Sequence, residues 1–332
     1  MNRPPILQME DIFYPILAVF GIPANLVTII ILSRGKCGLS KCIGADIMIM
    51  AVSDSSVTII NVVLYQILIK RLPGTFLHHT NFLIVIVYLM GVTLKLSQWC
   101  TVAFTVDRNV AICCQKFKTK YCRVKTVRIL AAVILILLAL ENIPHLFVFQ
   151  PLRIIGNISW GIEFRMEACN SPAFVAFTRL KSFLDLVCVF GSIFLFNGLT
   201  VRHVLVSSKS RMGFRSQRME NRHDTEMESR RKSIVLLFLV SGSFLLLWLP
   251  TNVTHFIAGH TMHSDRDYSS SNLIAALTGA LLAHLSSCTN TYIYAVTQDK
   301  FREELKILLM SPWTSVLALA KKSAHSNQTF LP

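Results

Sequence analysis

Seven long apolar stretches follow one another along this chain and limit what it can fold into. Each is about 20 residues or longer, the length that an α-helix needs to cross a hydrocarbon core of roughly 30 Å. Inside a bilayer the backbone polar groups must be satisfied within the segment, so such stretches form helices. We therefore predict an all-α fold, a seven-transmembrane helix bundle with spans near Ile12–Leu32, Ile43–Leu68, Phe82–Cys114, Val127–Phe149, Ala173–Val206, Ser233–Ala258 and Leu273–Val296.

Basic residues gather in alternate connections between these stretches. The chain has 332 residues and a net charge of +15, and its Lys and Arg are concentrated after the first, third, fifth and seventh stretches. By the positive-inside rule, this distribution predicts an extracellular amino terminus and a cytoplasmic carboxyl terminus. A nucleic-acid-binding protein would instead need a folded basic face with interleaved aromatic residues, which we do not find.

The ends of the chain are short in comparison with the bundle. We predict an extracellular tail over residues 1–11, the transmembrane domain over residues 12–296, and a surface helix followed by a cytoplasmic tail over residues 297–332. The stretch Asp299–Leu309 alternates charged residues with an apolar stripe. That pattern is typical of a short amphipathic helix lying on the inner membrane surface.

Charged residues inside the apolar stretches are costly and therefore candidates for function. Asp54 lies between apolar residues near mid-membrane, where a carboxylate costs on the order of 3 kcal/mol. Lys95 is a second such residue, at a depth comparable with those of Glu141 and Asp185. We predict an ion pair from Lys95 to Asp185 or to Glu141.

The fifth stretch contains two further basic residues, and the charged residues together allow one alternative function. Arg179 and Lys181 are expected to extend along the helix surface toward the membrane interface. The alternative function is a transporter or channel, in which Asp54, Lys95, Glu141 and Asp185 would form an ion or proton path. Transporters commonly show internal repeats with paired broken helices, and the sequence shows neither.

The stretch from Ser97 to Asn109 carries a polar line within an apolar helix. Ser97 and Arg108 are eleven residues apart, so they face the same way, about 16 Å apart along the helix axis. Pro250 breaks the hydrogen-bond ladder of the sixth stretch and predicts a hinge. The seventh stretch has its own polar line, formed by Ser286, Asn290 and Tyr294.

Together these motifs resemble the rhodopsin-like (class A) family of G-protein-coupled receptors over all seven stretches. Each motif alone is weak, and the resemblance rests on their order in the chain. They are Asn25, Asp54, Asp107-Arg108-Asn109, Leu247-Trp248-Leu249-Pro250 and Asn290-Thr291-Tyr292-Ile293-Tyr294. The Gly-x-Pro-Ala-Asn-x-x-Thr run that begins at Gly21 is similar to a branch of orphan receptors linked to aromatic amino acids and short peptides.

The resemblance implies roles for particular residues in a plasma-membrane receptor. Arg108 would engage a heterotrimeric G protein, and Asp107 would restrain it at rest. Phe244 and Trp248 would form a toggle under the ligand, with Pro250 as its pivot and Asn290 and Tyr294 taking part in activation. No cofactor is implied beyond an allosteric sodium ion, a hard cation suited to the oxygen ligands of Asp54, Ser97, Ser286 and Asn290.

Several family features are missing or altered. No cysteine stands at the outer end of the third stretch, where Leu83 lies, so Cys169 lacks the family's usual disulfide partner within the chain. Arg230 and Arg231 stand where many relatives carry an acid, which weakens the expected lock from the sixth helix on Arg108.

The ligand is expected to be a small molecule or a peptide bound in the outer half of the bundle. Met90 stands where relatives that bind monoamines carry an Asp, and the seventh stretch has no Lys for a retinal Schiff base. The Asn157-Ile158-Ser159 sequence predicts N-glycosylation in an outside loop. No catalytic motif is present, so an enzyme is not expected. The candidate ligand-binding residues are Met90, Leu94, Lys95, Asp185, Asn252, His255 and His284.

Overall fold

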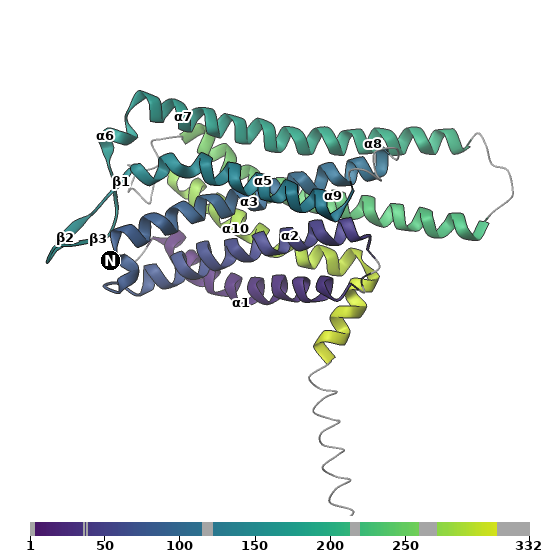
Figure 1. Cartoon of the computed structure of the whole chain (residues 1–332), viewed down its shortest axis with the longest axis horizontal. Helices are drawn as coiled ribbons and strands as arrows, with labels where there is room; N and C mark the ends of the chain where they lie inside the picture. Colours follow the sequence, from purple (N-terminus) through teal and green to yellow (C-terminus); the bar gives the residue numbers. More distant parts are fainter. Residues whose placement is uncertain are drawn as a thin grey trace, which may run out of the picture.

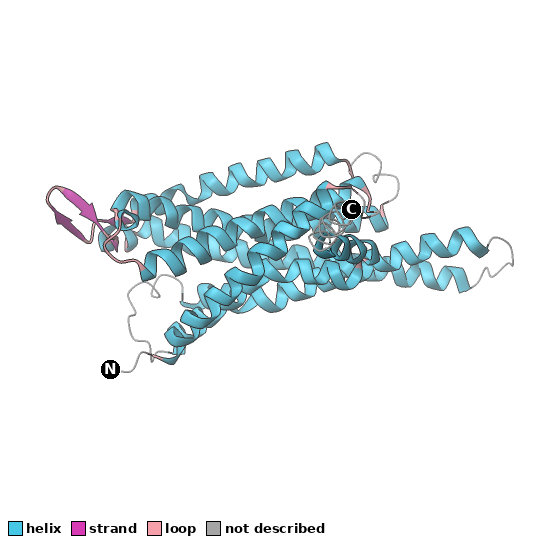
Figure 2. Ribbon diagram, turned by 90° about the horizontal axis from the view of Figure 1, so that it is seen from below, coloured by secondary structure: helices cyan, strands magenta, loops and turns pink. Residues whose placement is uncertain are grey.

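The protein folds into a bundle of seven long helices, shown in two views (Figures 1 and 2). The structure is a computed structural model that describes residues 4–35, 37, 39–114, 122–212, 220–258 and 271–310. All seven helices are long and apolar enough to cross a membrane. In chain order they are α1 (Pro5–Ser33), α2 (Lys41–Val57) continued by the π-helical η1 (Thr58–Ile69), α3 (Thr80–Cys113), α5 (Val124–Asn142) continued by the 3-10 segment η3 (Ile143–Phe147), α7 (Pro172–Leu184) continued by the π-helical η4 (Asp185–Phe190) and α8 (Gly191–Met212), α9 (Glu220–Ala258), and α10 (Ser271–Thr297).

The predicted all-α bundle is confirmed, with differences at the helix ends. Helix α1 begins at Pro5, so most of the segment 1–11 that we expected to be a tail is helical. Pro5 suits this start because the first turn of a helix does not use its backbone N–H groups. At the other end of the chain, residues 299–310 form the expected helix, and residues 311–332 lie outside the described residues.

The bundle places polar side chains inside and large apolar side chains outside. Asn25, Asp54 and Asn61 are buried, whereas Val19, Phe194 and Leu246 are among the most exposed side chains. A soluble protein shows the opposite arrangement. This distribution is expected for helices whose outer faces contact lipid and whose inner faces satisfy one another's polar groups.

A short β-structure projects from the end of the bundle at which α1 begins, and we call this the hairpin end (Figures 1 and 2). It lies between η3 and α7 and comprises two antiparallel pairs followed by the short helix α6 (Met166–Cys169). The strands are β1 (Phe149–Gln150) with β4 (Glu163–Phe164), and β2 (Arg153–Ile155) with β3 (Ile158–Trp160). We call the opposite end, where α10 ends, the tail end.

The β-structure is anchored to the start of α3 by noncovalent contacts. The Gly161 N–H donates to the His78 carbonyl at 2.8 Å, and the Thr80 hydroxyl donates to the Gly161 carbonyl at 2.7 Å. The His79 ring also lies against Trp160, with 4.6 Å between ring centroids. We call these contacts the loop anchor. Cys169 is a buried thiol that forms no disulfide with the other described cysteines, and burial raises its pKa.

At the tail end, the helix of residues 299–310 packs back on the bundle through its apolar side. The Phe301 side chain is 1% exposed and meets the Tyr294 ring edge to face, with 6.2 Å between centroids. Leu305 and Leu308 pack against the same cluster. The chain therefore turns sharply after α10, as Figure 1 shows in yellow.

Helices α9 and α10 approach one another closely at Gly279. A Cβ atom at this position would lie 2.9 Å from both the Cα and the N atom of Thr251, which follows Pro250 in α9. Neither backbone atom can move without shifting a whole helix. The absence of a side chain at Gly279 thus sets the spacing of the two helices beside the proline.

Replacing Gly279 with Ala should lower the thermal stability of the protein in detergent micelles. Forcing the backbones apart in a packed interior costs about 1–3 kcal/mol, more than the gain in helix propensity returns. Gly242→Ala is the matched control in α9, because a Cβ at Gly242 has no atom within 4 Å. Equal unfolding temperatures for the two variants would contradict this account of the spacing.

Candidate functional site

Asp54 is the centre of a buried polar site halfway along the bundle. The carboxylate is 1% exposed. Ser97 of α3 donates its hydroxyl to Oδ1 at 2.6 Å, and Asn290 of α10 donates its amide to Oδ2 at 2.8 Å. Three of the four residues predicted to hold sodium therefore come together. The fourth, Ser286, is buried, but the described hydrogen bonds to Asp54 do not include it.

The side chains next to this site join α1 to α10. Asn25 donates its amide to the Ser287 carbonyl at 2.8 Å, and the hydroxyls of Thr28 and Thr291 lie 2.8 Å apart. Thr291 also donates to the Asn25 side-chain oxygen at 3.4 Å. The Thr291 hydroxyl thus makes two contacts with α1 that a side chain without a hydroxyl could not make.

Three aromatic rings form a stack between this polar site and the hairpin end. The Phe244 ring lies 5.9 Å from Phe190 and 5.9 Å from Trp248, measured between ring centroids. Trp248 is buried, and its indole N–H has no hydrogen-bond partner among the described residues. A buried donor without an acceptor costs free energy. A rotation of the Trp248 ring that gave its N–H an acceptor would recover that cost.

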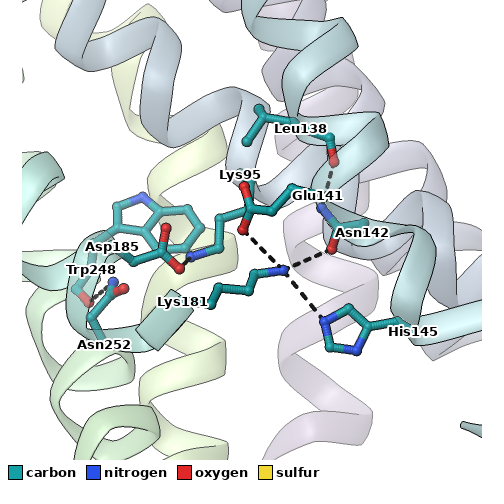
Figure 3. A network of polar contacts seen from close by, with 9 residues as sticks. All are labelled: Lys95, Leu138, Glu141, Asn142, His145, Lys181, Asp185, Trp248 and Asn252. Atoms are coloured by element: carbon teal, nitrogen blue, oxygen red, sulfur yellow. Dashed lines mark hydrogen bonds and ion pairs between the residues drawn. The ribbon is translucent and has the colours of Figure 1, made fainter. Parts of the chain in front are cut away.

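The charged residues nearer the hairpin end form two ion pairs (Figure 3). Lys95 of α3 pairs with Asp185 of η4, which confirms the first of the two partners expected for this lysine. Lys181 of α7 pairs with Glu141 of α5 at 3.2 Å. Its ammonium group also lies 3.1 Å from the Asn142 side-chain oxygen and 3.4 Å from the His145 ring nitrogen.

The inward position of Lys181 corrects one prediction. Arg179 is exposed, as an arginine extending toward the interface would be, but Lys181 is turned into the bundle. The reason is that Glu141 and Asn142 on the facing helix offer acceptors that lipid cannot supply. Among the described ion pairs, Glu141 pairs with Lys181 and Asp185 pairs with Lys95.

The seven predicted ligand-binding residues do not all meet at this network. Lys95 and Asp185 are in contact, and Leu94 packs against the aromatic stack. The other four make different contacts, although Asn252 is drawn in the same close-up (Figure 3). Met90 packs against the cluster of Ile69, Leu77, Leu83 and Ile86. Asn252 donates its amide to the Trp248 carbonyl of its own helix at 2.9 Å. His255 is exposed, and His284 packs on Tyr14 of α1 with 5.6 Å between ring centroids.

Arg108 is buried at the tail end of α3 between two carboxylates. It contacts Asp107, its neighbour in sequence, and lies 3.6 Å from Asp46 of α2. Its side chain is 2% exposed and its guanidinium carbon lies over the Phe104 ring at 5.6 Å. The acids of α9 precede Arg231, and their side chains lie outside those described, so the weakened lock from the sixth helix stays a prediction.

Asp46 was not identified from the sequence, although a signal was present. It lies eight residues before Asp54, a little over two turns, so both acids fall within the same broad face of α2. Asn109, on the other side of Arg108, donates its amide to the Phe196 carbonyl at 3.0 Å and the Thr200 hydroxyl at 2.9 Å. These bonds fix the end of α3 against α8.

An ion pair joins α9 to the start of the last helix at the tail end. Lys232 donates to Asp299 at 2.7 Å, and Arg302 also contacts this carboxylate. The hydrogen bond from Lys232 holds the pKa of Asp299 below its usual value, so the acid stays ionised at neutral pH. Arg231 is exposed, and the side chain of Arg230 lies outside those described.

One comparison with known proteins bears on this arrangement. A family model described as 7 transmembrane receptor (rhodopsin family) matches residues 24–294. The match spans all seven helices and includes every residue of the buried polar site, the aromatic stack and the Arg108 cluster.

Proposed function

The chain belongs to the rhodopsin family of seven-transmembrane receptors, and from this premise we propose that it couples an extracellular ligand to a heterotrimeric G protein. The observation that carries the proposal is the burial of Arg108 against Asp107 and Asp46. Both partners are carboxylates at the end of the bundle nearest the basic connections. Separation of Arg108 from them would free a cation for a partner protein that enters between the helices.

The two ion pairs near the hairpin end support a ligand that carries both charges. Asp185 can accept an ammonium group, and Lys95 and Lys181 can each bind a carboxylate. Such a ligand would replace ion pairs within the protein by ion pairs between the protein and the ligand. It would bind beside the aromatic stack. Amino acids and short peptides carry both charges, and aromatic ones would also contact Trp248.

The test of this proposal is nucleotide exchange by G proteins of several subtypes, measured with the purified receptor in lipid nanodiscs. Aromatic amino acids and short peptides are the first compounds to screen. Ligand-dependent exchange would support a receptor. Substrate flux or current in liposomes that contain no G protein would instead support the transporter or channel formed by Asp54, Lys95, Glu141 and Asp185.

We further propose that the hairpin end is extracellular and that Asn157 carries a glycan. Asn157 is exposed at the turn between β2 and β3, where an enzyme can reach it, and it adopts a positive φ of 68°. Asn157→Gln should then abolish the shift in gel mobility that N-glycosidase causes. Asn170→Gln is the control, because Asn170 is also exposed but is followed by Ser171-Pro172 and not by an acceptor sequence. A protein that is insensitive to N-glycosidase would contradict the glycan.

An allosteric sodium ion at Asp54 is also part of the proposal. The buried carboxylate and the Ser97 hydroxyl offer the oxygen ligands that a hard cation prefers, and the described ion pairs give Asp54 no cation of its own. Asn290 presents its amide N–H₂ to Asp54, so its oxygen would have to turn toward the ion.

Sodium should favour the resting state and stabilise the receptor. Replacing Na⁺ with a large organic cation at constant ionic strength is expected to lower the unfolding temperature and raise basal nucleotide exchange. Asp54→Asn should remove this dependence on sodium, because it removes the only charged ligand of the set. A sodium effect of equal size in the variant would place the ion elsewhere.

A further inference from the structure

Two cysteines and one aspartate converge at the tail end of the bundle from three different elements. Cys42 lies in the first turn of α2, Asp107 lies near the end of α3, and Cys122 lies in the connection just before α5. The Cys42 sulfur is 3.4 Å from Asp107 Oδ1, and the three donor atoms all lie within 4.8 Å of one another. Cys42 and Asp107 are buried, and Cys122 is half-buried.

These distances suit a tetrahedral metal ion. Zinc binds sulfur at about 2.3 Å and carboxylate oxygen at about 2.0–2.2 Å, which places a sulfur about 3.5 Å from an oxygen and about 3.8 Å from a second sulfur. The Cys42–Asp107 separation is already at that value. Because the Cys122 sulfur lies within 4.8 Å of the other two donor atoms, closing the set requires a shift of about 1.3 Å or less.

The local charges also favour a divalent ion. Without metal, the Asp107 carboxylate and the Arg108 guanidinium neutralise each other. When zinc binds, both thiols lose their protons, and the two thiolates and the carboxylate contribute three negative charges. Because two protons leave as one divalent ion enters, the net charge of the cluster, Asp46 included, is the same before and after binding. Asp46 lies on the far side of Arg108 and is not a ligand.

From this geometry we infer that Cys42, Asp107 and Cys122 form a zinc site, with water as the fourth ligand. Thiolate ligands select zinc over magnesium and calcium, which prefer oxygen. The half-buried Cys122 leaves the metal reachable from solvent, as an open coordination position requires. Two protons are released for each zinc bound.

Zinc at this site would act on the residue that holds Arg108. Asp107 would bind the metal through Oδ1 and Arg108 through Oδ2, so the metal would keep the carboxylate oriented toward Arg108. It would also join the start of α2 to the end of α3 and to the connection before α5. This step rests on the proposed function. In a receptor that couples to a G protein, zinc at this site favours the resting state and lowers basal nucleotide exchange.

Cobalt(II) titration of the full-length receptor in detergent micelles tests the site directly, with a phosphine reductant present. Cobalt replaces zinc and gives an absorption band when thiolates bind it. We expect one equivalent to bind to the wild type with this band, and zinc to displace it. Cys42→Ser and Cys122→Ser should each weaken the band and lower the cobalt affinity at least about tenfold.

Cys114→Ser is the matched control, because Cys114 is near the end of α3 and outside the cluster. It should bind cobalt like the wild type. Thermal unfolding confirms that each variant is folded. A thiolate band that persists in the Cys42→Ser/Cys122→Ser double variant would overturn the site, and so would a folded wild type with no band. A Cys42–Cys122 disulfide in the purified protein, with no metal binding after its reduction, would overturn it as well.

The effect on signalling is a separate measurement. Free zinc should lower basal exchange in the wild type and in Cys114→Ser, but not in the double variant. If cobalt binds as expected and exchange does not respond to zinc, the site stands and its role in the resting state is wrong. If no G protein responds to the receptor under any condition, the proposed function fails and the metal-binding result is unaffected.

Discussion

Arg108→Ala is expected to reduce nucleotide exchange, basal or ligand-induced, to the level of G protein without receptor. Arg108 is the one cation between Asp107 and Asp46 in the described part of the tail end, and its side chain is almost fully buried. The substitution removes the group that would contact the G protein. It also leaves two carboxylates facing each other, which costs about 3–5 kcal/mol when a buried ion pair loses one member.

A second variant separates loss of coupling from loss of folding. Arg108→Lys keeps the charge but not the planar guanidinium, so it should fold with near-normal stability and still couple poorly. Arg128→Ala is the control, because Arg128 is a basic residue of α5 that is exposed near the same end. It should leave exchange unchanged. Full exchange by folded Arg108→Ala would show that the receptor activates its partner without this residue.

Reversing the Lys95–Asp185 pair should restore a stability that either single change destroys. Asp185→Lys places two lysines together, and Lys95→Asp places two acids together, with the side chains only 19% and 11% exposed in the native pair. Each single variant should lower the unfolding temperature in detergent, because breaking a largely buried pair leaves a charge without a partner. The double variant should recover most of the loss, with a coupling energy of roughly 1–3 kcal/mol.

The same four proteins test the ligand site. If the ligand carries both charges, the reversed pair should fold but bind the ligand more weakly, because each charge now stands where its opposite stood. Arg179→Ala is the control on α7, because Arg179 is exposed and outside the network. Single variants that are as stable as the double variant would show that the pair does not hold α3 to η4.

Much of the fold and part of the site could be predicted from the sequence. Apolar length alone defines the seven helices, since each must cross the same thickness of lipid. Helical periodicity also predicts which residues share a face and a depth. That is why Asp185 could be proposed as the partner of Lys95. Asp54, Ser97 and Asn290 were instead placed together by the resemblance to rhodopsin-like receptors.

The contacts that were missed depend on how each helix is rotated and which neighbour it faces. Lys181 was expected at the interface because its partners, Glu141 and Asn142, lie on another helix whose facing side the sequence does not reveal. Asp46 beside Arg108 and Cys42 beside Cys122 are contacts of the same kind. Depth follows from the position of a residue in its own helix, whereas contact requires the orientation of two helices.

The loop anchor of Gly161, His78 and Thr80 attaches the β-structure to the start of α3 by hydrogen bonds and not by a covalent bond. Each of its hydrogen bonds contributes only about 0.5–1.5 kcal/mol. With the His79–Trp160 ring contact added, separating the β-structure from the start of α3 would cost a few kcal/mol. If the proposed ligand enters past the β-structure, noncovalent contacts set the rate of its entry, and the formation or reduction of a disulfide does not.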